Sequence, residues 1–150
     1  MTATVHILNG PNLNLLGTRE PHLYGHTTLA QVEQRCQTLA AELGLRCVFR
    51  QSNHEGVLVD WVQEARAAGA AVVINPAGLS FRSIPLLDAL KTVDLPVIEV
   101  HITNIHRREA PYQQSLTAHA STGVICGLGP QGYELALHAV AARLREAATV

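Results

Sequence analysis

Arg19 and Tyr24 are the first residues of this chain whose types and spacing suggest chemistry. They stand five positions apart within the polar segment 9–25, which directly follows the apolar run 5–8. A phenol of pKa ~10 needs about 4 kcal/mol of stabilisation to be largely ionised near neutral pH. A cation at ~4 Å supplies about 4 kcal/mol at an effective dielectric near 20, but only about 1 kcal/mol in bulk water. The pair therefore predicts a general base that works in a dry site, and the loss of Arg19 should move the activity profile to higher pH.

Glu99 and His101 form a second candidate pair. They alternate along the apolar run 97–101, so both side chains point to one face of the expected strand. A carboxylate can orient an imidazole and favour its protonated form, which suits a general acid near neutral pH. A hydrogen-bonded pair with a purely structural role at a strand end remains the alternative.

Other familiar kinds of site are not indicated. The eight histidines show no spacing typical of a metal site, so we expect no metal. Residues 127–132 are rich in glycine, but they lack the lysine of a phosphate-binding loop and are better interpreted as a tight turn, so no cofactor is expected. A serine nucleophile would need a Gly-x-Ser-x-Gly turn, which the sequence does not contain.

Strands and helices must bring the two pairs together. Five β-rich runs alternate with segments of helical periodicity, which predicts an α/β fold. The expected strands are 5–8, 46–51, 72–75, 97–101 and 122–127, and the expected helices are 28–43, 57–68, 86–91 and 132–147. We expect a flavodoxin-like, doubly wound, five-stranded parallel sheet of order 2-1-3-4-5 with helices on both faces. Its switch point would lie between the loops that follow the first and third strands, and no linker divides residues 1–150, so one catalytic domain is expected.

Composition sets the context. The formal net charge is −1 and no basic run occurs, so neither nucleic acid nor a membrane surface is an expected partner. The three cysteines have no paired spacing, which is typical of a reducing compartment. No leader pattern and no apolar run approaching ~20 residues is found, so a cytoplasmic location is expected.

Several separate motifs, in the same order along nearly the whole chain, resemble the type II 3-dehydroquinate dehydratases. The matching segments are 9–25, 51–56, 74–76, 88–90, 96–101, 104–106 and 127–133. The resemblance implies a hydro-lyase of the shikimate or quinate pathway. Such an enzyme converts 3-dehydroquinate to 3-dehydroshikimate by anti elimination through an enolate, without metal or cofactor.

The resemblance also implies a role for each matching residue. Tyr24 would be the base, and Arg19 would stabilise its phenolate. His101, oriented by Glu99, would protonate the departing hydroxyl. Asn12 would stabilise the enolate. The residues that would bind the substrate are Asn75, Asp88, Ile102 and Thr103. Asp88 would reach in from a neighbouring subunit, since the family forms homo-oligomers in which trimers assemble into dodecamers.

Two positions depart from the family pattern. Phe81 and Tyr112 stand where the family usually has a histidine and an arginine that contact substrate. We hypothesise that Arg82 or Arg108 supplies part of the missing recognition. Two alternatives therefore stay open: a paralogue that dehydrates a related cyclic keto acid, and a catalytically silent binding or scaffold protein.

Overall fold

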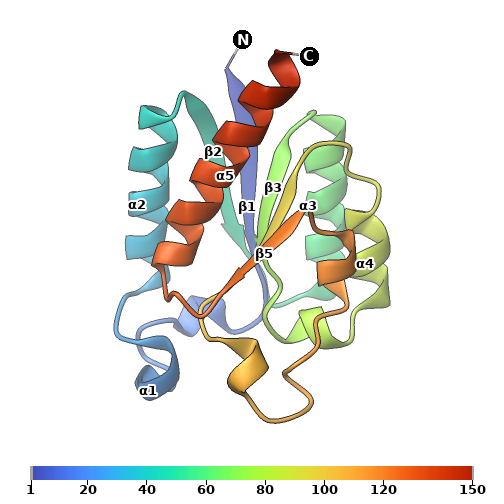
Figure 1. Ribbon diagram of the computed structural model, residues 1–150. Coiled ribbons are helices and arrows are strands. Elements are labelled where there is room, and N and C mark those ends of the chain that lie inside the picture. The colour runs from blue at the N-terminus through green and yellow to red at the C-terminus, as the bar shows by residue number, and fades with distance from the viewer. Residues whose placement is uncertain (1, 150) are drawn as a thin grey trace.

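The computed structural model describes residues 2–149, with both termini at the same end of the molecule (Figure 1). The strands are β1 (Ala3–Asn9), β2 (Leu45–Gln51), β3 (Ala71–Asn75), β4 (Val97–His101) and β5 (Gly123–Cys126). The α-helices are α1 (Pro21–Tyr24), α2 (Leu29–Glu42), α3 (Glu55–Ala67), α4 (Ile84–Leu90) and α5 (Gln131–Ala148). Short 3₁₀ turns are η1 (Leu13–Leu15), η2 (Ala77–Phe81), η3 (Ile105–Arg107) and η4 (Thr117–Ala120). Among residues 2–149, no helix combines the length and the apolar character needed to cross a membrane.

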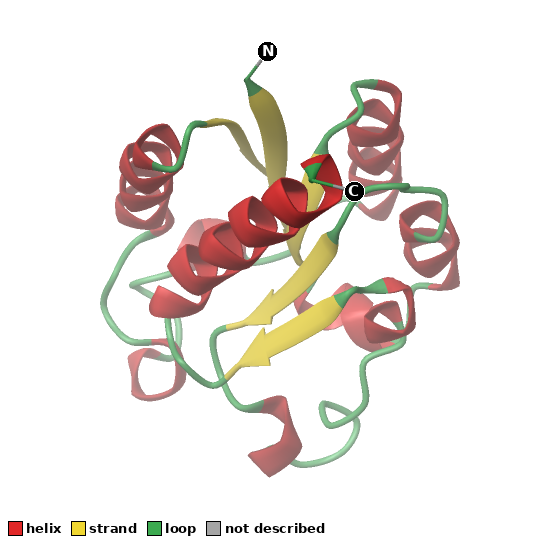
Figure 2. Ribbon diagram, turned by 45° about the horizontal axis from the view of Figure 1, so that its top comes forward, coloured by secondary structure: helices red, strands yellow, loops and turns green. Residues whose placement is uncertain are grey.

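All five strands are parallel and follow the order β2-β1-β3-β4-β5, which confirms the predicted topology (Figure 2). The register pairs Asn9 with Gln51 on one side and with Asn75 on the other. Because parallel strands end at a common edge, these polar side chains and those that follow β4 meet at one end of the sheet. That end is opposite the chain termini, at the bottom of Figure 1.

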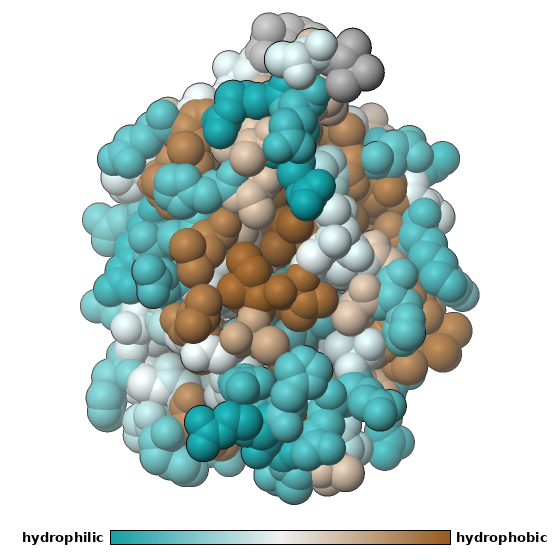
Figure 3. Space-filling view, in the orientation of Figure 1, coloured by the Kyte–Doolittle hydropathy of each residue, from teal (hydrophilic) through white to brown (hydrophobic). Residues whose placement is uncertain are grey.

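Two hydrophobic cores, one on each face, hold the sheet between its helices. Alternate residues of β1 supply both cores: Val5 and Ile7 pack toward α2 and α5, and Leu8 packs toward α3 and α4. β3 and β4 are buried at every position and are apolar except at Asn75, Glu99 and His101, as expected for a parallel sheet covered on both sides. The surface toward the viewer in Figure 3 is hydrophobic near its middle and mainly hydrophilic at the end where the site lies.

Local signals in the sequence fix where the main helices begin. Thr28 and Gln31 form a capping box at the start of α2, with N···O distances of 3.2 and 3.0 Å. The hydroxyl of Ser83 accepts from the backbone N–H of Leu86 at 3.0 Å at the start of α4, and donates to Glu55 at 2.6 Å.

The loop between β1 and α2 is more ordered than its composition suggests. The polar segment 9–25 contains both η1 and α1. Burial of Leu13 and Leu16 anchors the first turn, and Pro21 at the start of α1 sets the second. Gly10 fixes the root of the loop, because a Cβ there would lie 2.4 Å from the carbonyl oxygen of Pro76.

A buried polar junction ties α5 to the two central strands. The Tyr133 hydroxyl donates to Asn9 Oδ1 at 2.7 Å and accepts from Asn75 Nδ2 at 3.0 Å. All three side chains are buried, and this burial raises the pKa of Tyr133, which keeps its phenol neutral. The junction fixes the ends of β1 and β3 directly below the site.

Candidate active site

A cavity of about 360 Å³ opens at the carboxyl edge of the sheet, beside β3 and β4. It brings together most of the residues that the sequence nominated, from segments far apart in the chain. Those that line it are Asn12, Arg19, Tyr24, Asn75, His101, Ile102 and Thr103. Glu99 lies behind His101 rather than in the lining, and Asp88 lies elsewhere on α4.

The Glu99 and His101 side chains form a buried pair at the end of β4. His101 Nε2 lies 2.7 Å from Glu99 Oε2, and the carboxylate is fully buried while the imidazole reaches the cavity. Two hydroxyls complete the carboxylate shell: Ser115 Oγ donates to Oε2 at 2.6 Å, and Thr117 Oγ1 donates to Oε1. A carboxylate with three partners is held in one orientation, and it holds the imidazole in turn.

The pKa of Glu99 reflects a contest between burial and hydrogen bonding. Burial alone would raise it, but the contact with His101 and the hydroxyl donors Ser115 and Thr117 outweigh burial and lower the pKa below its usual range. Glu99 is therefore ionised near neutral pH and places a negative charge against the His101 ring. Sequence reasoning missed both hydroxyl residues, because nothing in their local sequence indicates that their loop folds back on β4.

Tyr24 stands across the cavity, half-buried at the end of α1. Arg108 Nη1 donates to its hydroxyl at 3.3 Å, whereas the Arg19 guanidinium lies over its ring, 5.3 Å from the centroid. Arg19 also lies 3.5 Å from Glu20, and both side chains are substantially exposed. The phenol therefore has two cations nearby, and the one at its hydroxyl comes from the loop after β4 rather than from its own segment.

Two hydrogen bonds between backbone and side-chain groups fix the start of the Tyr24 loop. The Asn12 N–H donates to Asn53 Oδ1 at 2.9 Å, and Gln51 Nε2 donates to the Gly10 carbonyl at 3.1 Å. Asn12 itself has a φ of 71°, a left-handed conformation that asparagine tolerates better than most residues. These contacts fix the backbone at Asn12, which lines the cavity.

Asn75 presents a partly committed amide to the cavity. Its Oδ1 accepts from the Ala77 N–H at 3.1 Å, and its Nδ2 donates one hydrogen to Tyr133. One amide hydrogen remains available for a ligand. The backbone of Ile102 and Thr103 lies beside it, just beyond the end of β4.

Three further residues named from the sequence have contrasting positions. Arg108 lines the cavity, but its fellow candidate Arg82 is exposed and lies outside the lining. Asp88 is exposed on α4 and does not line the cavity of its own chain. Of the two arginines considered, only Arg108 is placed to meet a ligand in this cavity.

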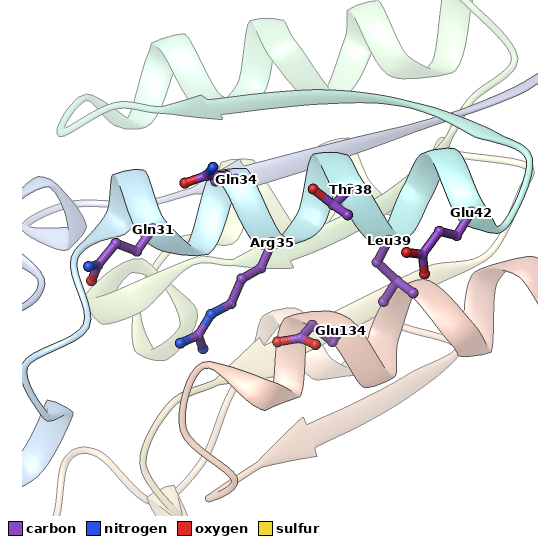
Figure 4. Close-up of a pocket in the computed structure, with 7 residues that line it drawn as sticks. All are labelled: Gln31, Gln34, Arg35, Thr38, Leu39, Glu42 and Glu134. Carbon is purple, nitrogen blue, oxygen red and sulfur yellow. The ribbon is translucent and has the colours of Figure 1, made fainter.

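A second hollow, of about 500 Å³, lies on the helical surface between α2 and α5 (Figure 4). Its charged residues are Arg35, Glu42 and Glu134, and Arg35 extends from α2 toward α5. It is larger than the cavity at the sheet edge, but it contains no imidazole, phenol or thiol and has no strand end beneath it. Within the described part of the chain, no group of three or more His, Cys, Asp or Glu residues is arranged to hold a metal ion.

Comparison with known proteins places this geometry in a family. The sequence model of the family described as dehydroquinase class II matches residues 3–141. This chain belongs to the class II dehydroquinase family. The 3-dehydroquinate dehydratase of Chelativorans sp. (strain BNC1) is 57% identical over 145 residues, covering 96% of this chain and 100% of the relative.

Other members of the family agree with this assignment. The 3-dehydroquinate dehydratase of Caulobacter sp. (strain K31) is 55% identical over 141 residues, covering 94% of this chain and 96% of the relative. The crystal structure of type II dehydroquinase from Propionibacterium acnes superposes with a TM-score of 0.92 at 43% identity, covering 95% of this chain and 98% of that one. The flavodoxin-like dehydroquinase fold is thus shared over almost the whole length.

Proposed function

We propose that this class II dehydroquinase removes water from 3-dehydroquinate to give 3-dehydroshikimate, a step shared by the shikimate and quinate pathways. The observation that supports this most directly is that one cavity holds two facing groups: a phenol with two guanidiniums nearby and an imidazole held by a buried carboxylate. The substrate is a cyclic β-hydroxy ketone acid. Its dehydration requires one base beside the ketone and one acid at the leaving hydroxyl, which is what the two sides of the cavity offer.

The two groups act in sequence. Tyr24, as phenolate, takes the proton from the carbon between the ketone and the carbon that bears the leaving hydroxyl, and the electron pair of that C–H bond forms the enolate. The enolate then collapses, the C–O bond breaks, and protonated His101 gives its proton to the departing hydroxyl, which leaves as water. Because Nε2 of His101 contacts Glu99, the proton comes from the other ring nitrogen. At the end of each turnover Tyr24 has gained a proton and His101 has lost one. Proton exchange with solvent restores both groups.

Other groups around the cavity hold the substrate and its charge. The backbone N–H groups of Ile102 and Thr103 suit the carboxylate, and the free amide hydrogen of Asn75 suits a ring oxygen. Asn12 stabilises the enolate oxygen, and Arg19 and Arg108 favour the phenolate. Arg19 is substantially exposed, so closure of its loop over the substrate would strengthen its effect by excluding water.

A direct assay tests the proposal. The pure protein is mixed with 3-dehydroquinate, and the ultraviolet absorbance of the conjugated enone is followed. Substrate labelled with deuterium on either face of the reacting carbon tests the stereochemistry, and only the label anti to the leaving hydroxyl should pass to water. Absence of enone would favour the silent homologue, and loss of the label from the other face would contradict the assigned positions of base and acid.

We also propose that the protein is a homo-oligomer, a dodecamer built from trimers, in which Asp88 completes the site of a neighbouring subunit. Ile84 and Asp88 lie four residues apart on α4, so they share one face of this helix, and both are exposed. An apolar side chain beside a carboxylate on an exposed face suits a contact between subunits. Light scattering on the purified protein measures the assembly, and a monomer with full activity would exclude a role for Asp88 in a shared site.

A further inference from the structure

A continuous row of contacts runs along one side of the cavity from the acid to the base. The Phe81 ring stacks beside His101, with centroids 6.2 Å apart and planes at 30°. The edge-on contact from Phe81 to Tyr112 measures 5.7 Å between centroids at 83°. Arg108 covers the Tyr112 ring at 4.4 Å and reaches the Tyr24 hydroxyl at 3.3 Å. We call Phe81 and Tyr112 the aromatic wall.

The aromatic wall offers little to a ring hydroxyl. Phe81 has no atom that donates or accepts a hydrogen bond, yet it lines the cavity next to the acid. Tyr112 has one ring face under Arg108 and contacts Phe81. Arg108 is held between the Tyr112 ring and the Tyr24 hydroxyl. Its charge is therefore directed at the base and not at a substrate hydroxyl.

A substrate bound between Tyr24 and His101 would lie against the aromatic wall, which connects the surroundings of the two. Besides the leaving hydroxyl, 3-dehydroquinate has further ring hydroxyls that take no part in elimination. A site that hydrogen-bonds a hydroxyl rejects the analogue without it by about 10⁴ to 10⁵, because its own buried polar groups are left unpaired. An apolar surface discriminates between the same two molecules by only about 10².

We propose that the aromatic wall gives this site weak selectivity for the spectator hydroxyls, so that it also dehydrates cyclic β-hydroxy keto acids that lack them. The simplest such compound is 1-hydroxy-3-oxocyclohexane-1-carboxylate. Its reaction removes the same proton and the same hydroxyl, forms the same kind of enone and releases one water. This inference rests on the proposed function, because it assumes that Tyr24 and His101 act on 3-dehydroquinate as described.

The test compares kcat/KM for 3-dehydroquinate with kcat/KM for the hydroxyl-free analogue, both followed by enone absorbance. For the native protein we expect the kcat/KM for 3-dehydroquinate to exceed that for the analogue by less than about 10³. This limit lies between the value for an apolar surface and the value for a site that hydrogen-bonds the hydroxyl. Phe81→His adds a hydrogen-bonding group beside His101 and should raise the ratio at least tenfold, about 1.4 kcal/mol. Phe81→Leu keeps the surface apolar and should retain the low ratio, and Arg82→Ala, next in sequence but outside the cavity, is the matched control.

Two outcomes would overturn this inference while leaving the proposed function intact. One is a ratio of the two kcat/KM values above about 10³ for the native protein. The other is an equal ratio in Phe81→His and Phe81→Leu, provided that circular dichroism shows both variants to be folded. Turnover of the analogue without turnover of 3-dehydroquinate would overturn the proposed function and leave the wall supported. Tyr112→Phe removes the hydroxyl of the wall and retains the ring under Arg108. A loss above tenfold on 3-dehydroquinate only would show that Tyr112 binds a spectator hydroxyl, which also contradicts the proposal.

Discussion

The acid side and the base side of the cavity are built in opposite ways. On the acid side, Glu99 is fully buried at a strand end and is contacted by His101, Ser115 and Thr117. On the base side, Tyr24 ends a four-residue helix, and the Arg19 side chain is 43% exposed. The acid is thus fixed in advance by the sheet, whereas the base lies on a segment with few buried contacts, which is the kind of segment that can close over a substrate.

Tyr24→Phe tests the base side most severely. Removing the hydroxyl should lower kcat for 3-dehydroquinate by about 10³, within the range for loss of a general base. The half-buried ring remains and the hydroxyl loses only a long, part-buried contact of 3.3 Å with Arg108, so the midpoint of thermal unfolding should stay within about 2 °C of the native value. A loss of tenfold or less would mean that another group takes the proton.

Glu99→Gln should affect both activity and stability, in contrast to Tyr24→Phe. The neutral amide no longer places a negative charge against the His101 ring, so kcat should fall by about 10². The folded-state pKa of Glu99 is lowered, so its ionisation stabilises the native state above the ordinary glutamate pKa, and this contribution is lost as pH falls through the folded value. Urea unfolding at pH 7 should show a less stable variant, and equal stability would argue against a preorganised acid.

Arg108→Ala tests the link between the two sides. A hydrogen bond to a charged group contributes about 1.5 to 3 kcal/mol, so kcat should fall by roughly ten- to a hundredfold if Arg108 stabilises the phenolate. Arg107→Ala is the matched control, because Arg107 is exposed and does not line this cavity. Similar kcat values for Arg108→Ala and Arg107→Ala would mean that Arg108 does not support the base. Arg19 would then be the cation on which Tyr24 depends.

The smallest expected effect comes from substituting His6 on β1, and it is a change in how stability depends on pH. Burial lowers its pKa below 6.5, and repulsion from Arg50 adds to this, although Glu64 opposes it. The unfolded chain therefore binds the proton more readily, so stability falls as pH drops below about 6.5, toward the folded value. His6→Leu should lose less stability than the native protein between pH 7.5 and 5.5 in urea unfolding. That window lies above the range in which Glu99 titrates, so it separates the effect of His6 from that of the Glu99 carboxylate.

The sequence predicted the frame of the molecule better than its contacts. Strands with β-rich composition and helices with apolar periodicity have local signals, and the parallel order followed from their alternation. The positions of Ser115 and Thr117 carry no such signal, because their contacts with Glu99 depend on how a loop packs in three dimensions. Arg19 was the expected partner of the phenol because it is near in sequence, yet the cation at the hydroxyl is 84 residues away.

The junction of Tyr133 with Asn9 and Asn75 has a consequence for how the molecule is made. Its partners are up to 124 positions apart, and Tyr133 lies in α5, the last helix among residues 2–149. During synthesis, the ends of β1 and β3 emerge long before that helix and have no phenol to pair with. The catalytic edge therefore reaches its final form only after α5 has been made and has docked on the sheet.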